Sequence, residues 1–141
     1  MAFLHSPLKI LHVDDDHPLR LMTRTALNRS GKDFLVESCA SAHDAFSKIE
    51  NFQPHLLLVD FMMPIMDGPS FVAKVHSLGD AFRLIPVVFI TGKDDIAFEN
   101  RAALEPIIGI IRKPFSPVTL GDDLEQLWMS YEKRSSAEPE L

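Results

Sequence analysis

Five short apolar runs alternate with five amphipathic segments along this chain, and no other feature constrains the fold as strongly. The runs cover residues 8–13, 34–39, 55–59, 86–90 and 107–111. Each has the usual length of a strand, and the runs at 55–59 and 86–90 are apolar enough to be covered on both faces. Strict alternation of strands and helices predicts a parallel sheet with helices on both faces, joined by right-handed crossovers.

Apolar residues at helical spacing predict the helices between these runs. The expected helices cover residues 18–28, a segment after Ser41, a segment after Asp67-Gly68, residues 94–104 and residues 118–131. Asp16 and Ser41 are expected to cap the first two helices, because their side-chain oxygens can accept hydrogen bonds from free N–H groups of the first turn.

A chain of 141 residues supports one domain and excludes two full ones. We expect an N-terminal extension over 1–7, the domain over 8–134 and a flexible tail over 135–141. The net charge of −6 argues against a general nucleic-acid binder. No apolar run approaches the ~20 residues of a membrane helix, and the single cysteine, Cys39, favours a reducing compartment. We therefore expect a cytoplasmic protein with no direct nucleic-acid or membrane partner.

Polar residues stand where the predicted strands end. They are Asp14, Asp15 and Asp16 after the first run, Asp60 after the third, Thr91 after the fourth and Lys113 after the fifth. The carboxyl ends of parallel strands meet at one edge of a sheet, where such folds bind their ligands. Carboxylates held close together repel one another, so a cation is needed. Oxygen ligands without a Cys/His cluster favour Mg²⁺.

Each of these residues also has an ordinary structural explanation. A single aspartate after a strand often caps the next helix, which is what we expect of Asp16. Thr91 suits a strand, and Lys113 alone would be a surface lysine. Asp60 has no evident capping role, since Phe61 and two methionines follow it. The combination is therefore more specific than any of its members.

Four segments together resemble a known family. They are Val13-Asp14-Asp15-Asp16, the stretch from Leu58 to Gly68, Phe89-Ile90-Thr91-Gly92 and Lys113-Pro114-Phe115. In this order they resemble the CheY-like receiver domain of two-component response regulators, over about residues 8 to 131. The resemblance implies a flavodoxin-like (βα)5 doubly wound α/β sandwich with strand order 2-1-3-4-5. It also implies that Asp60 accepts a phosphoryl group from a histidine kinase or a histidine phosphotransfer protein.

The same resemblance implies roles for the other site residues. Asp15, Asp60 and the backbone carbonyl of Met62 would bind Mg²⁺, with Mn²⁺ as a substitute, and Asp14 would support the metal through water. Thr91 and Lys113 would bind the phosphoryl group, and the Lys113–Pro114 peptide bond would be cis.

One departure from the family pattern affects the expected switch. Ile110 stands where the family usually has Tyr or Phe as the partner of the switch threonine. The resemblance also implies that the residues at the positions of Met62 and Lys93 flank the path of an attacking water. Neither side chain offers an acid or amide to position that water, so we expect slow loss of the phosphoryl group.

We expect a stand-alone receiver with an unknown downstream protein target, and leave dimerisation on phosphorylation open. One alternative is a receiver cut from a hybrid kinase or a multidomain response regulator. Two others, of different classes, are an aspartyl-phosphate phosphatase and a flavin-binding module. The phosphatase chemistry would want an acid/base Asp at position 62, where this chain has Met62.

Overall fold

The computed structural model describes residues 6–92, 98 and 100–137. Within these residues, strands and helices alternate as the apolar pattern predicts. Their order is β1 (Leu8–Val13), α1 (His17–Asn28), β2 (Phe34–Cys39), α2 (Ala42–Phe52), β3 (Leu56–Asp60), α3 (Gly68–His76), β4 (Val87–Thr91), α4 (Arg101–Leu104), β5 (Ile107–Arg112) and α5 (Pro117–Ala137).

The strands form one parallel sheet in the order β2-β1-β3-β4-β5, which confirms the predicted topology. β3 and β4 each begin and end one residue later than the apolar runs suggest. Asp60 pairs with Ile90 inside the sheet, and the N–H of Phe61 donates to the Ile90 carbonyl at 2.8 Å. Asp60 and Thr91 are therefore the last residues of their strands and are held in place by the sheet.

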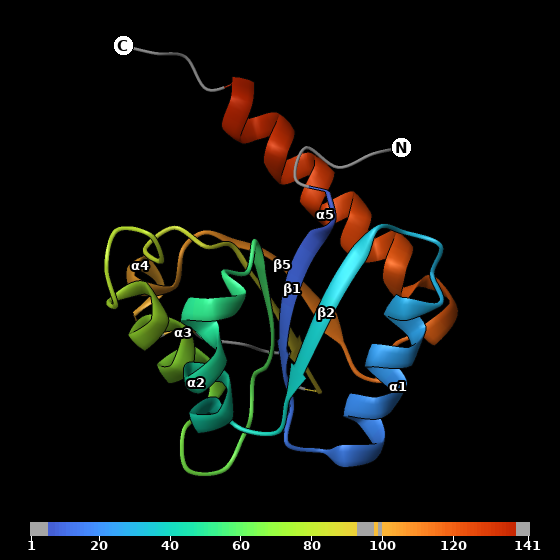
Figure 1. The fold of residues 1–141 in the computed structure, drawn as a ribbon, viewed down its shortest axis with the longest axis horizontal. Helices are drawn as coiled ribbons and strands as arrows, with labels where there is room; N and C mark the ends of the chain where they lie inside the picture. Colours follow the sequence, from blue (N-terminus) through green and yellow to red (C-terminus); the bar gives the residue numbers. More distant parts are fainter. Residues whose placement is uncertain (1–5, 93–97, 99, 138–141) are drawn as a thin grey trace.

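Helices cover both faces of the sheet (Figure 1). α2, α3 and α4 lie on one face and α1 and α5 on the other. Each face has its own apolar core, because successive side chains of a strand point to opposite faces. Leu11, Val13 and Val59 belong to the core under α2 and α3, whereas Ile10 and Leu58 belong to the core under α1 and α5.

Side-chain caps fix where three helices begin, close to the carboxyl ends of the strands. Asp16 accepts a hydrogen bond from the N–H of Leu19 at 3.1 Å, and Ser41 accepts one from the N–H of Asp44 at 3.0 Å, as the sequence predicts. Asp67 does the same at the start of α3, where it accepts from the N–H of Ser70 at 2.8 Å.

The fourth helix is shorter than predicted. Residues 94–97 and 99 of the expected helix over 94–104 lie outside the described residues, and α4 begins only at Arg101. Phe98 is not helical; its ring packs 5.7 Å from that of Phe61 and 5.5 Å from that of Phe89, measured between centroids. Asn100 makes no side-chain cap bond to the helix. Phe98 therefore belongs to an aromatic cluster and not to the predicted helix.

The last helix is longer than predicted. α5 runs to Ala137, so residues 135–137, which we expected in the flexible tail, are helical, and the remaining tail residues lie outside the described part. Good helix formers such as Glu132, Lys133 and Arg134 continue the helix past the core contacts of Trp128. Its final turns project beyond the sheet in Figure 1. Among the described residues, no helix combines the length and hydropathy needed to span a bilayer.

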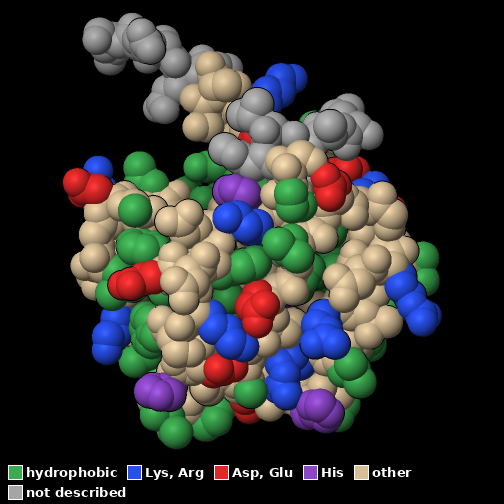
Figure 2. All heavy atoms as spheres, viewed as in Figure 1, with side chains coloured by type: hydrophobic (Ala, Val, Ile, Leu, Met, Phe, Trp, Pro, Cys, Tyr) green, Lys and Arg blue, Asp and Glu red, His purple; other side chains and the backbone are tan. Residues whose placement is uncertain are grey.

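Charged side chains of both signs are mixed on the face drawn in Figure 2, so no patch of one sign covers it. Lys48, for example, lies 3.1 Å from a Glu37 carboxylate oxygen and 3.7 Å from one of Asp44. Such exposed pairs contribute little to stability. The strong electrostatics of this molecule lie at the carboxyl edge of the sheet.

Candidate functional site

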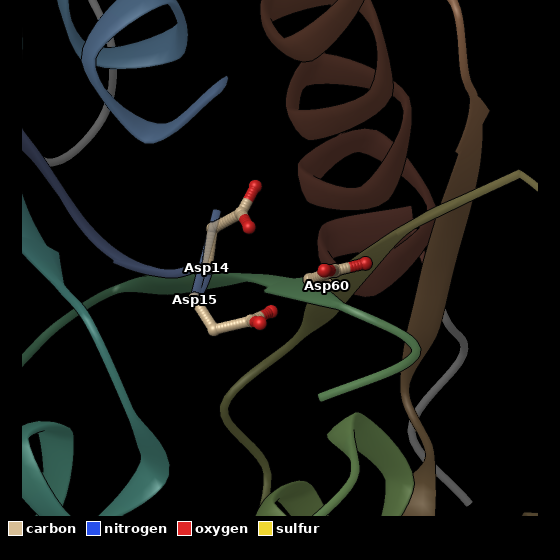
Figure 3. Close-up of side chains that lie close together, drawn as sticks. All are labelled: Asp14, Asp15 and Asp60. Carbon is tan, nitrogen blue, oxygen red and sulfur yellow. The ribbon is translucent and has the colours of Figure 1, made fainter. Parts of the chain in front are cut away.

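Three carboxylates from the ends of adjacent strands meet at this edge. Asp14 and Asp15 directly follow β1, and Asp60 ends β3 (Figure 3). One ligand oxygen from each lies within 4.8 Å of the others. Asp14 is fully buried and Asp60 is 4% exposed, whereas Asp15 is open to solvent. The structure thus assembles a half-buried acidic pocket from the residues that the sequence singles out.

Asp14 is the most constrained of the three carboxylates. Its Oδ1 accepts a hydrogen bond from the N–H of Asp16 at 2.9 Å, while its buried Oδ2 has no hydrogen-bond partner among the described residues. Burial raises the pKa of Asp14 from 3.8 to about 6, and the charges of Asp60 and Asp15 act in the same direction. Arg20, on α1, donates from Nη1 to the backbone carbonyl of Asp14 at 2.8 Å.

Opposing effects act on the ionisation of the Asp60 carboxyl. Its Oδ1 is 3.1 Å from Lys113 Nζ, in a part-buried ion pair. Burial raises the pKa of Asp60, although Lys113 and the N–H of Met62 both favour the ionised form. The lysine is thus the cation that holds a buried carboxylate at the end of a central strand.

Thr91 and Lys113 are brought together by the pairing of β4 with β5. Thr91 is buried at the end of β4, and its backbone carbonyl accepts a hydrogen bond from the N–H of Lys113 at 2.7 Å. The Lys113–Pro114 peptide bond is cis, as the family resemblance implies. A hydroxyl-bearing residue and an ammonium therefore stand on adjoining strand ends beside Asp60.

This donor set fits a hard divalent cation. Carboxylate oxygens are the ligands that Mg²⁺ and Mn²⁺ prefer, and all three carboxylates offer one within a single small volume. The buried Oδ2 of Asp14 adds an acceptor that is otherwise unpaired among the described residues. A bound cation would also relieve the repulsion between these groups.

The remaining predicted site residues lie in exposed positions or outside the described residues. Ile110 lies on β5, paired with Phe89 and 42% exposed, so it presents an aliphatic surface at the switch position. Met62 is 56% exposed on the loop after β3. Lys93 lies outside the described residues.

Two residues that shape the pocket escaped the sequence argument. Arg20 holds the main chain of Asp14, and no motif marks it. Gly68 packs against the backbone of Asp60, because a Cβ there would lie 2.4 Å from the Asp60 carbonyl oxygen. The signal for Gly68 was present in the Asp67-Gly68 pair, but it indicates only a turn.

The geometry agrees with comparisons to known proteins. The family model of the response regulator receiver domain matches residues 10–125. The chain belongs to the response regulator receiver family. It is 32% identical over 119 residues to chemotaxis protein CheY1 of Helicobacter pylori, covering 84% of this chain and 94% of that protein. The fold of the chain is similar to that of the chemotaxis response regulator CheY4 of Vibrio cholerae. The TM-score is 0.72 and the identity is 28%, over 84% of this chain and 97% of the other.

Receivers also occur as parts of longer proteins. The chain is 33% identical to response regulator Rre1 of Synechocystis over 86% of its own length, but it spans only 50% of that relative. Membership of the family therefore identifies a signalling domain of two-component systems.

Proposed function

We propose that this receiver accepts a phosphoryl group on Asp60 from a histidine kinase or a histidine phosphotransfer protein. The observation that carries the proposal is the placement of the Asp60 carboxylate. It is nearly buried, lies 3.1 Å from Lys113 Nζ and shares a small volume with Asp14 and Asp15. Family membership supports the same chemistry.

In this proposal an oxygen of Asp60 is the nucleophile. It forms a bond to the phosphorus of a phosphohistidine while the phosphorus–nitrogen bond breaks, and the bonding electron pair leaves with the imidazole nitrogen. Only the ionised carboxylate can attack, and burial disfavours that form. Lys113 offsets this effect by pairing with Oδ1, and its ammonium then lies close to the incoming phosphoryl oxygens.

Asp15, Asp60 and the backbone carbonyl of Met62 would hold Mg²⁺ or Mn²⁺, with Asp14 acting through water. When bound, the cation supplies positive charge that offsets the charge of the carboxylates and the phosphoryl oxygens. Asp60 is the one carboxylate of the three that lies within a strand, because Asp14 and Asp15 follow the end of β1.

The proposed output is a change of the surface that a downstream protein binds. A phosphoryl group on Asp60 would recruit the hydroxyl of Thr91 and the ammonium of Lys113. Ile110 lies on β5, three residues before Lys113, so the aliphatic surface at this position would move with the strand. Experiment identifies the downstream protein and tests dimerisation as a second outcome of phosphorylation.

The test is phosphorylation of the whole chain by acetyl phosphate with Mg²⁺, followed by mapping of the labelled residue. We expect label on Asp60, none in Asp60→Asn, and strongly reduced labelling in Lys113→Ala. Asp67→Asn is a matched control, because Asp67 caps α3 outside the acidic pocket. Labelling of Asp60→Asn at the wild-type level would overturn the proposal. Repeated turnover of a phosphate ester by the wild type would favour an aspartyl-phosphate phosphatase instead.

We also propose that the receiver unit spans residues 8–134 and works in the cytoplasm. The sheet and the packed part of α5 fall within these limits. Cys39 is a buried free thiol, which suits a reducing compartment. Whether this receiver acts alone or within a hybrid kinase or a larger regulator is decided by the length of its open reading frame.

A further inference from the structure

His76 is a buried side chain that the phosphorylation chemistry does not use. It is the last residue of α3 and is 8% exposed. Its Nδ1 lies 2.9 Å from the backbone carbonyl of Ala103, on α4, and its Nε2 lies 2.8 Å from the carbonyl of Ile85, just before β4. One ring thus connects three parts of the fold.

Both contacts of the ring are with acceptors, which limits the number of protons it can carry. A neutral imidazole has one N–H donor and one lone pair, so it can donate to only one of two carbonyls. The other nitrogen would then present a lone pair to a buried carbonyl oxygen, an unfavourable contact. A ring with protons on both nitrogens donates to both carbonyls. The end of a helix also favours a cation, because the free carbonyls there carry partial negative charge.

We propose that His76 is a proton-dependent latch that holds α4 against α3 and the start of β4. With both nitrogens protonated, the ring fixes the carbonyl of Ala103 and, through it, the short helix of Arg101–Leu104. Loss of one proton removes one of the two hydrogen bonds and loosens α4.

Charged side chains on the elements beside His76 have contacts with other groups. Arg101 and Glu105 on α4 pair at 2.8 Å, Asp80 and Arg83 between α3 and β4 lie 3.9 Å apart, and Lys74 on α3 stands over the ring of Phe46 at 5.3 Å. Glu50 on α2 is exposed. Among the described residues, the two backbone carbonyls are the hydrogen-bond partners given for the His76 ring.

The regulatory meaning of this latch rests on the proposed function, because α4 and β5 would form part of the face that meets a downstream protein. The latch itself does not depend on phosphorylation. Its test therefore uses the unphosphorylated chain, and its failure would leave phosphorylation of Asp60 unaffected.

The first experiment counts ring protons by NMR on the full chain with ¹⁵N-labelled histidine, with His76 assigned from the spectrum of His76→Gln. At about pH 7, we expect both ring nitrogens of His76 to give the shifts of protonated nitrogens. A neutral ring with one protonated nitrogen would overturn the proposal. This measurement needs only the wild-type fold, apart from the assignment.

The second experiment measures amide-exchange protection at Ala103 and Glu105, whose N–H groups donate to backbone carbonyls at the start of α4 and just before it. We expect protection in His76→Gln to be about tenfold lower than in the wild type, the effect of one charge-assisted hydrogen bond. The exposed His43→Gln should behave as the wild type. Equal protection in the wild type and in a folded His76→Gln would contradict the latch.

Discussion

Ionisation of Asp14 carries a cost for the folded protein, because the carboxyl is buried. Its carboxyl titrates near 3.8 in an unfolded chain, whereas burial raises its pKa to about 6 in the folded protein. Between these two values the folded protein holds a proton that the unfolded chain has lost. Stability therefore falls as pH rises through this window, and the full cost remains above about pH 6.

We expect Asp14→Asn to remove this pH dependence, because the amide keeps the acceptor for the N–H of Asp16 and carries no charge. The variant should be more stable than the wild type by up to about 3 kcal/mol at about pH 7 and about equal to it at about pH 4. Urea unfolding at both pH values measures the difference. A difference that is the same at both would show that the charge of Asp14 is not the cause.

Met62 allows a second prediction at the level of one side chain. It is exposed beside the proposed phosphoacceptor and cannot orient a water molecule. We expect Met62→Asn to speed loss of the phosphoryl group by about threefold to tenfold, less than a full acid–base catalyst provides. Decay is followed after the acetyl phosphate is removed.

Ile65→Asn is the matched control, because it introduces the same amide at an exposed position of the same loop. Lys93→Glu tests the second position that the sequence analysis connects with this lifetime. Unchanged decay in both Met62→Asn and Lys93→Glu would assign the rate to the backbone geometry of the site.

The start of α3 shows how closely an element is fitted to the site. Gly68 allows the first turn of the helix to approach the carbonyl of Asp60, where a Cβ would lie only 2.4 Å from the oxygen. We expect Gly68→Ala to lower stability by about 1–3 kcal/mol, the usual cost of overpacking, and to slow labelling by acetyl phosphate.

Gly92→Ala is the control for this prediction, because a Cβ at that position meets no described atom within 4 Å. Both variants are compared by urea unfolding and by the rate of labelling. Equal stability of Gly68→Ala and the wild type would mean that α3 can shift without disturbing β3.

Elements with strong local patterns could be predicted from the sequence, and those set by distant contacts could not. The five strands follow from short, mainly apolar runs, and the caps at Asp16 and Ser41 follow from local chemistry. The placement of Phe98 depends on one ring directly after β3 and one on β4, which periodicity does not reveal. Likewise, the carboxylates of the site are visible as strand ends, whereas Arg20 and His76 act through backbone carbonyls that have no sequence signature.

At the scale of the whole molecule, we expect Mg²⁺ to raise the melting temperature, because a ligand that binds only the folded state stabilises it by mass action. At tenfold excess over its dissociation constant the shift should be about 4 °C for a domain of this size. Asp15→Ala should show a much smaller shift. Without metal it should melt at or above the wild-type temperature, since one repelling charge is gone.

Thermal melts with and without Mg²⁺, and with Mn²⁺ in its place, measure these effects. Asp44→Ala serves as the control, because it removes a carboxylate on α2 that lies outside the acidic pocket. Equal Mg²⁺ shifts in the wild type and Asp15→Ala would place the cation elsewhere.

The backbone hydrogen bond between Thr91 and Lys113 has a mechanical consequence. It joins the ends of β4 and β5 directly under the two side chains proposed to grip the phosphoryl group. A force on either side chain is therefore transmitted to both strands. The pairing of the two strands continues back through Ile90–Ile111 and Phe89–Ile110. Position 110 has no aromatic ring that could rotate. A displacement at the site would therefore reach the surface as a movement of the two paired strands as one rigid unit.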